Sequence, residues 1–131
     1  MTAAEFEISE LDKSLAEDGE DIILRRVVGS TNQVFVDVKC RAFVRGYEAK
    51  DLIAGLIQRQ RKVIISPTQI NRAQWPGGQP ISTVQFESDP RIPNKNRGDK
   101  CIIAGGTCAV ETGAGIQIGE TLIRIDMRVL G

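Results

Sequence analysis

Alternation of small apolar and polar side chains marks the stretch from Gln33 to Tyr47 as a long strand. Its even-numbered positions are small or apolar, and half of its odd-numbered positions are charged. Because successive side chains of a strand point to opposite faces, one face is expected to be buried and the other wet. The stretch Leu122–Leu130 repeats this pattern. Two strands with one wet face each predict an antiparallel sheet.

Shorter segments with strand character and frequent turn signals surround these two. A turn at residues 29–32 predicts a hairpin before the long strand, and Gly105 with Gly106 predicts a second two-residue hairpin turn. Gly113 and Gly115 are expected to break the chain. Many short strands with close turns favour a mainly β fold, a small antiparallel β-barrel or sandwich. The predicted strands are 21–28, 33–47, 54–58, 63–65, 99–104, 107–111, 116–118 and 122–130.

Two segments have helical spacing and helix-capping residues. Residues 2–18 carry a narrow apolar stripe, and Gly19 follows as a stop. A helix this polar needs a surface to lie on, on its own chain or on another subunit. One short internal helix is predicted from Pro67 to about Gln74, with a capping box formed by Ser66 and Gln69. A single helical turn is also expected near 49–53.

A long extended loop is predicted at residues 76–98, which hold four of the five prolines and no long periodic element. A loop of this length inside a compact domain is typically functional or disordered. One interpretation is an arm that lies across a partner. The alternative is a disordered surface loop. The candidate partner-contact residues of the arm are Trp75, Phe86, Arg91 and Ile92.

The charge of the chain is strongly polarised. A length of 131 residues is that of one domain, here an acidic N-terminal helical arm at 1–20 followed by a β domain at 21–131. The formal net charge is zero, but residues 1–21 carry eight acids and one lysine, a net charge of −7, which leaves +7 on the rest. Such a chain can dock its acidic arm on a basic surface, its own or a neighbour's.

The sequence contains few residues of the types that carry out catalysis. The chain has no histidine, which removes the commonest general base and metal ligand. Three cysteines without a CxxC pair do not make a zinc site, and the glycines lack the lysine of a phosphate loop. We therefore predict a protein that is not an enzyme, with no cofactor and no metal. No apolar run reaches the length of a membrane span, so we expect no membrane partner and synthesis in the cytoplasm.

Two of the cysteines flank the predicted glycine turn. With both glycines in the turn, Cys101 faces Val110 and lies diagonally from Cys108, about 7 Å or more away. A disulfide needs Cβ atoms about 4 Å apart, so a bond within the hairpin requires a shifted register. Cys101 and Cys108 are candidates for a disulfide between subunits, and free thiols are the alternative. Cys40 is expected to be an inert core thiol.

Basic residues gather at Arg59, Arg61 and Lys62, which are expected to form a loop tip. Aromatic side chains for base stacking are not interleaved with them, so sequence-specific nucleic-acid recognition is not favoured. Non-specific contact with DNA remains possible for such a tip. These three residues are therefore the candidate basic tip of a DNA channel.

Four segments of the chain form a set: LRRVVGSTNQVFVDVKCRAFVRGY, KVIISPTQI, DPRIPNKNRGDKCIIAGG and LIRIDMRVLG. This set, which covers most of residues 24–131, resembles the head-closure (head–tail joining) proteins of tailed bacteriophages. The resemblance implies a structural protein in a homo-oligomeric ring of about six or twelve copies at the neck of the virion. Such a ring joins the portal, usually through an adaptor, to the tail and helps to retain packaged DNA.

Other readings of the sequence remain open. A tail terminator or another ring protein of the tail tube is the alternative within the same particle, and both are also expected partners of a neck ring. Outside a virion, the alternative is a small β-barrel nucleic-acid-binding module. The resemblance implies a location in the virion neck, with assembly in the host cytoplasm.

Overall fold

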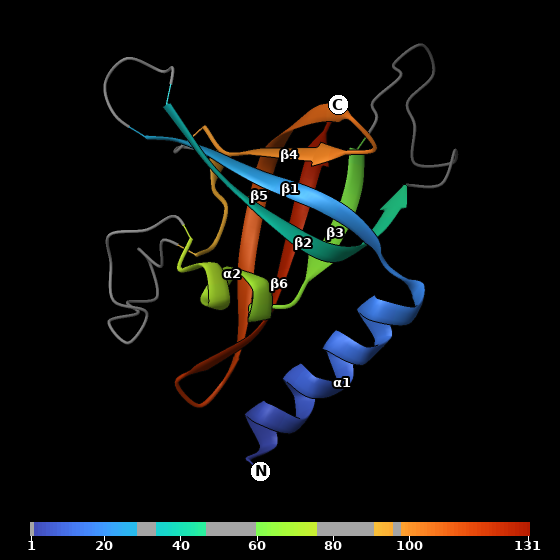
Figure 1. Ribbon diagram of the computed structural model, residues 1–131, viewed down its shortest axis with the longest axis vertical. Coiled ribbons are helices and arrows are strands. Elements are labelled where there is room, and N and C mark those ends of the chain that lie inside the picture. The colour runs from blue at the N-terminus through green and yellow to red at the C-terminus, as the bar shows by residue number, and fades with distance from the viewer. Residues whose placement is uncertain (1, 29–33, 47–59, 76–90, 96–97) are drawn as a thin grey trace.

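In the computed structural model, six strands of the described residues close into an antiparallel barrel (Figure 1). The structure describes residues 2–28, 34–46, 60–75, 91–95 and 98–131. The strand order around the barrel is β1-β2-β3-β6-β5-β4. The elements are α1 (Ala3–Asp18), β1 (Glu20–Val28), β2 (Val34–Gly46), β3 (Gln60–Ile65), α2 (Thr68–Ala73), β4 (Lys100–Ile103), β5 (Gly106–Ile118) and β6 (Thr121–Leu130). The predicted mainly β fold and both predicted helices are confirmed, and the barrel forms rather than the sandwich.

Some predicted elements lie outside the described residues. They are the turn at 29–32, the helical turn at 49–53, the strand at 54–58 and most of the loop at 76–98. The strand predicted at 63–65 is longer than expected and begins at Gln60.

The apolar side chains of the two long strands, β2 and β6, fill the barrel interior, as their alternation in the sequence predicts. In β2, Val38, Cys40 and Ala42 are buried, whereas Asp37 and Lys39 are exposed. The inward side chains of β6 include Ile125, Met127 and Val129. The barrel closes where β1 pairs with β4 over Ile22–Arg25, and the far ends of β5 and β6 extend beyond β4 and β3 as a two-stranded ribbon.

The glycines of β5 do not break the strand, contrary to the prediction. β5 continues through Gly113 and Gly115, with register shifts against β6 between Val110 and Thr112 and between Ile116 and Gln117. A Cβ atom at Gly113 would collide with the backbone of Pro93, and one at Gly115 would collide with the side chain of Ile92. These glycines therefore let residues 92–93 lie directly on the strand.

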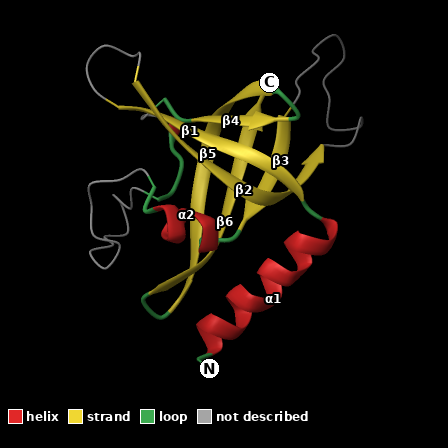
Figure 2. Cartoon of the chain, in the orientation of Figure 1, coloured by secondary structure: helices red, strands yellow, loops and turns green. Residues whose placement is uncertain are grey.

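α1 begins and ends as predicted and lies against the barrel of its own chain (Figure 2). The Thr2 hydroxyl accepts a hydrogen bond from the Glu5 N–H, and the Glu5 carboxylate accepts one from the Thr2 N–H, both at 3.1 Å. The side chain of Leu15, which belongs to α1, is buried. The Arg41 guanidinium donates to the carbonyl oxygens of Leu15 and Gly19 at 3.1 and 2.7 Å. Arg41 Nη2 also donates to the Ala16 carbonyl oxygen at 3.3 Å, so Arg41 ties the end of α1 to β2.

α2 starts at Thr68, and its predicted capping box does not form. The Ser66 hydroxyl accepts a hydrogen bond from the Thr68 N–H at 3.2 Å, but no side chain caps the helix itself. Trp75 follows α2 and is buried, with its indole N–H donating to the Val36 carbonyl at 2.9 Å. This bond fixes the end of the α2 segment on β2.

A buried ion pair joins β1 to the chain that enters β4. Arg26 Nε and Nη2 donate to the two carboxylate oxygens of Asp99 at 2.8 and 2.7 Å, and the two side chains are 7% and 1% exposed. The guanidinium carbon lies 4.5 Å from the centroid of the Trp75 ring, a cation–π contact. The Asn94 N–H donates to Asp99 Oδ2 at 2.8 Å. One pair of charges therefore fastens β1, the end of the α2 segment and residues 94–99 together.

Removing one member of this pair is expected to destabilise the domain more than removing both. Asp99→Ala leaves the buried Arg26 guanidinium without its carboxylate, which should lower the free energy of unfolding by about 3–5 kcal/mol. Arg26→Met combined with Asp99→Leu should recover part of that loss. Urea unfolding followed by the fluorescence of Trp75, the single tryptophan, measures both effects.

The exposed pair of Arg25 and Asp37 is the matched control, because it is also bidentate, with both distances 2.9 Å. Asp37→Ala should have a much smaller effect, since solvent and salt screen this pair. Equal losses for Asp37→Ala and Asp99→Ala would contradict the structural role of the buried pair.

Candidate functional site

Several charged side chains form ion pairs on the outside of the barrel. Hydrogen bonding to Arg25 holds the pKa of Asp37 below its usual range. Arg124 Nε and Nη2 donate to the carboxylate of Asp126 at 2.6 and 2.9 Å, and this hydrogen bonding raises the pKa of the guanidinium. These pairs lie on the wet face of strands, not in an enclosed cleft. They are typical of structural ion pairs, not of acid–base catalysts.

Ligand-binding features are sparse in the described part of the chain. No group of three Cys, Asp or Glu side chains there is placed to hold a metal ion. No helix among these residues has the length and apolar character needed to cross a bilayer. An open groove of about 280 Å³ lies between α1 and the β5–β6 ribbon. Its lining residues are Glu7, Glu10, Leu11, Ser14, Ile116, Ile123 and Arg124.

The β4–β5 hairpin turns one residue earlier than the sequence predicts. Ala104 and Gly105 are its two central residues, and both have a positive φ, 49° and 83°. Two positive φ values in a two-residue loop are characteristic of a type I′ turn, which an alanine rarely enters. The register therefore places Cys101 directly opposite Cys108, and the predicted pairing of Cys101 with Val110 is wrong.

All three cysteines are free thiols in the barrel core. Cys101 and Cys108 are 0% and 1% exposed, so neither lies at the rim that a disulfide between subunits requires. Directly opposite residues have Cβ atoms about 4.5–5.5 Å apart, which lies at or beyond the upper limit for a relaxed disulfide. Burial raises the pKa of Cys40 and of Cys101 to about 12. These two thiols therefore stay protonated and unreactive near neutral pH.

The predicted basic tip is not a single surface. Arg61 and Lys62 are neighbours in β3, so they point to opposite faces of the strand. Arg61 Nη2 donates to Cys108 Sγ at 3.2 Å and to the Gly131 carbonyl oxygen at 3.4 Å, at one end of the barrel. Lys62 points outward and is 46% exposed. Arg59 lies outside the described residues, so the structure offers no common DNA-facing tip for the other two.

The predicted contact residues of the arm are anchors within the chain. Trp75 is buried beside Arg26, and Arg91, 6% exposed, donates from Nη1 to Asn71 Oδ1 at 2.9 Å. Ile92 is half-buried over the glycines of β5. Phe86 lies outside the described residues. Trp75, Arg91 and Ile92 therefore pack on the barrel of their own chain at the two ends of the segment 76–90. That these residues also contact a partner stays a prediction.

The sheet register assembles a cationic row that the sequence analysis missed. Arg45 of β2 stands directly opposite Lys62 of β3, which stands directly opposite Arg128 of β6. All three residues are exposed. Arg45 was already visible on the charged face of the long strand, but its neighbours depend on the pairing of β2, β3 and β6. We call Arg45, Lys62 and Arg128 the cationic row.

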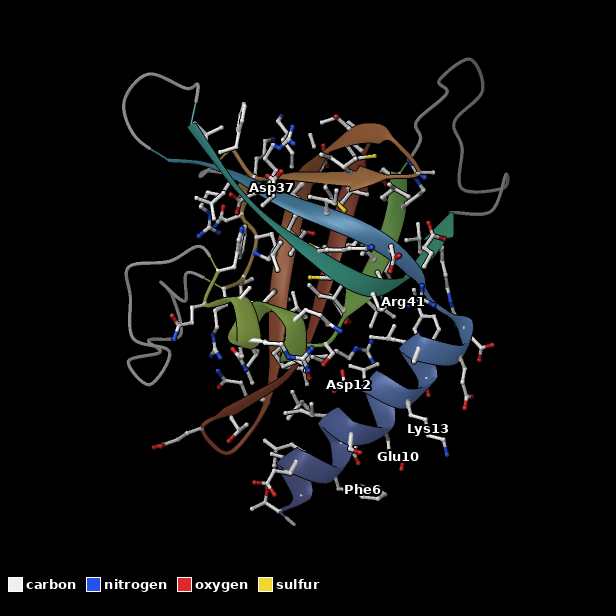
Figure 3. All side chains as sticks on the ribbon, in the orientation of Figure 1. Phe6, Glu10, Asp12, Lys13, Asp37 and Arg41 are labelled. Atoms are coloured by element: carbon white, nitrogen blue, oxygen red, sulfur yellow. The ribbon has the colours of Figure 1, made fainter. Side chains whose placement is uncertain are left out.

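α1 carries exposed acids at helical spacing. Glu7, Glu10 and Glu17 fall on one stripe. Figure 3 shows Phe6 and Lys13 on the side of α1 turned away from the barrel, whereas Glu7 and Glu10 line the groove between α1 and the β5–β6 ribbon. We call Glu7, Glu10 and Glu17 the acidic stripe. The candidate functional surfaces are thus two exposed patches of opposite charge on one rigid body.

Comparison of this chain with protein-family models, with curated proteins and with solved structures found no match.

The buried thiols of Cys40 and Cys101 predict that the protein loses stability at alkaline pH. Their folded-state pKa values of about 12 lie above the ordinary cysteine value of 9.0, so the native state keeps protons that the unfolded state releases. Their contribution is complete below pH 9 and falls as the pH rises from 9 to 12, by about 1.4 kcal/mol per pH unit for each thiol. Urea unfolding at several pH values measures this slope.

The control for this slope is the variant Cys40→Ala with Cys101→Ala. It is less stable at neutral pH because of the cavities that it leaves, but its alkaline slope should be shallower. Identical slopes for the two proteins would show that the thiols titrate alike in the folded and unfolded states.

Proposed function

We propose that this chain is a structural, non-catalytic subunit of a ring in the neck of a tailed bacteriophage. In this role it joins the portal or its adaptor to the tail and helps to retain packaged DNA. The proposal rests on the resemblance of four segments to head-closure proteins and on the placement of charge in the structure. The chain would be assembled in the host cytoplasm and located in the virion neck.

The observation that supports the ring most strongly is the separation of unlike charges on a rigid closed barrel. A ring needs head-to-tail contacts, in which one patch meets a different patch of the next subunit. The acidic stripe of α1 and the cationic row of β2, β3 and β6 are such a pair of unlike patches.

The same observation keeps a second function open. An exposed row of three cations suits the phosphate backbone of a nucleic acid, so a small β-barrel nucleic-acid-binding module is the alternative. A tail terminator would use the same head-to-tail contacts at the adjoining ring. These functions differ in what the purified chain binds.

Loss of the chain from the phage that encodes it is expected to uncouple head and tail. Cells infected with a nonsense mutant should accumulate free tails and heads that leak DNA, because no ring closes the portal. Electron microscopy counts the tailed particles, and adding purified wild-type chain to the extract should restore them. A normal yield of tailed particles from the mutant would contradict the proposal.

The binding module is tested separately by gel retardation of short single-stranded and double-stranded oligonucleotides. The neck subunit should give at most weak binding that disappears as salt is raised. Tight, saturable binding to single strands at physiological salt would favour the module.

A further inference from the structure

The groove between α1 and the β5–β6 ribbon has an apolar floor (Figure 1). Three apolar side chains line it, Leu11 of α1, Ile116 of β5 and Ile123 of β6. Leu11 and Ile123 are half-buried, and Ile116 is 39% exposed. The chain therefore leaves part of this apolar surface open to solvent.

A β-bulge in β6 shapes the floor. The pairing of β5 with β6 shifts between Ile116 and Gln117 and leaves Ile123 as an extra residue in β6. In a regular strand Ile123 and Arg124 would point to opposite faces, but here both line the groove. Ile125, the next residue, is buried in the barrel. The bulge therefore turns two consecutive side chains of β6 toward α1.

The α1 side of the groove carries two carboxylates, those of Glu7 and Glu10. Arg124 lines the same groove, but its Nε and Nη2 donate to the carboxylate of Asp126 at 2.6 and 2.9 Å. Among the residues that the structure describes, neither Glu7 nor Glu10 forms an ion pair. The groove thus joins an apolar floor to two carboxylates that have no cation of their own.

The walls of the groove are held in place. The Arg41 guanidinium ties the end of α1 to β2, and the Thr68 hydroxyl donates to Asp12 Oδ2 at 2.6 Å. Figure 3 shows Asp12 on the side of α1 toward the barrel. Because α1 is fixed at two points, the groove is preformed, and a molecule that enters it need not order its walls.

The size and charge of the groove limit what it can hold. Pockets for drug-sized ligands have volumes of about 300–1,000 Å³, whereas this open groove has about 280 Å³. That volume suits one or two side chains of a peptide better than a whole cofactor. The two carboxylates repel the phosphates of nucleic acids and of anionic lipids.

We propose that the groove binds a segment of another protein in which an apolar side chain stands beside an arginine or a lysine. The apolar side chain covers Ile116 and Ile123, and the cation binds Glu7 and Glu10. These two acids are three residues apart on α1, which places their Cβ atoms about 5–6 Å apart, so one guanidinium can reach both carboxylates. This contact goes beyond the proposed neck function, because the chemistry of the groove alone defines it.

Titration with short peptides tests this contact. The probe is the end-blocked peptide Gly-Arg-Leu-Ile-Arg-Gly, and two control peptides carry glutamate in place of both arginines or serine in place of leucine and isoleucine. NMR spectra of the ¹⁵N-labelled chain at low salt follow the amides of Leu11, Ile116 and Ile123. The probe should shift them saturably, with a dissociation constant of about 1 mM or tighter, and neither control peptide should saturate.

Two variants of the groove should weaken binding of the probe. Glu7→Gln with Glu10→Gln removes both ion pairs and should raise the dissociation constant about tenfold. Ile116→Ser removes apolar surface from the floor and should raise it by a similar factor, about tenfold. Only the effect of the glutamine variant should disappear when salt is raised, because salt screens ion pairs but not apolar contacts.

Each variant has a matched control at exposed positions outside the groove. Glu17→Gln with Glu20→Gln makes the same change in net charge. Phe6→Ser removes an apolar side chain from the side of α1 that is turned away from the barrel. Both controls should bind the probe like the wild type. Urea unfolding checks that every variant is folded.

The proposal would be overturned if the probe does not saturate, or if the glutamate peptide binds equally well. Controls that lose as much affinity as the groove variants would place the binding elsewhere and overturn it too. Self-association of the chain that Ile116→Ser abolishes would assign the groove to a second copy instead. None of these outcomes decides the neck function, which the nonsense mutant tests.

Discussion

The buried ion pair of Arg26 and Asp99 is the constraint on which the rest of the barrel depends. Two charges are stable there because the carboxylate is engaged by a bidentate guanidinium and a backbone N–H, and the guanidinium lies on the Trp75 ring. The Val110 N–H donates to the Asp99 carbonyl at 3.2 Å, so the backbone of the same aspartate helps to fix the β4–β5 register. That register is what brings Cys101 opposite Cys108. This one ion pair thereby fixes the position of the chain where it enters β4 and the position of the end of the α2 segment.

Because these polar groups pair with one another in the interior, the features of the surface that could recognise a partner are charged side chains. The thiols of Cys40 and Cys101 are protonated, the paired surface carboxylates stabilise the sheet, and the described residues show no group that could hold a metal ion. What remains exposed is a row of cations set by strand pairing and a stripe of acids set by helical spacing. Both are held on a closed barrel. This division between a satisfied interior and a polarised exterior is what we expect of an assembling subunit.

The sequence predicted those features that depend on local pattern. Alternation identified β1, β2 and β6, and the capping pair of Thr2 and Glu5 located α1. The sequence pattern did not predict features of the structure that depend on contacts between residues distant in the sequence. Ala104 enters the left-handed region because the hairpin register requires it, and Gly113 continues a strand because Pro93 lies on it. Arg26 was not predicted to be buried, although it shares a face with Ile22 and Leu24, and its partner Asp99 is distant in the sequence. The cationic row likewise appears only once the order of β2, β3 and β6 is known.

The central claim is that the chain works as one of many identical copies joined through unlike charged faces. Electron microscopy of the purified chain at low ionic strength tests this claim most directly. The account predicts closed rings of uniform diameter that dissociate as salt is raised, because screening weakens contacts between exposed charges. Isolated barrels at every salt concentration and protein concentration would contradict it.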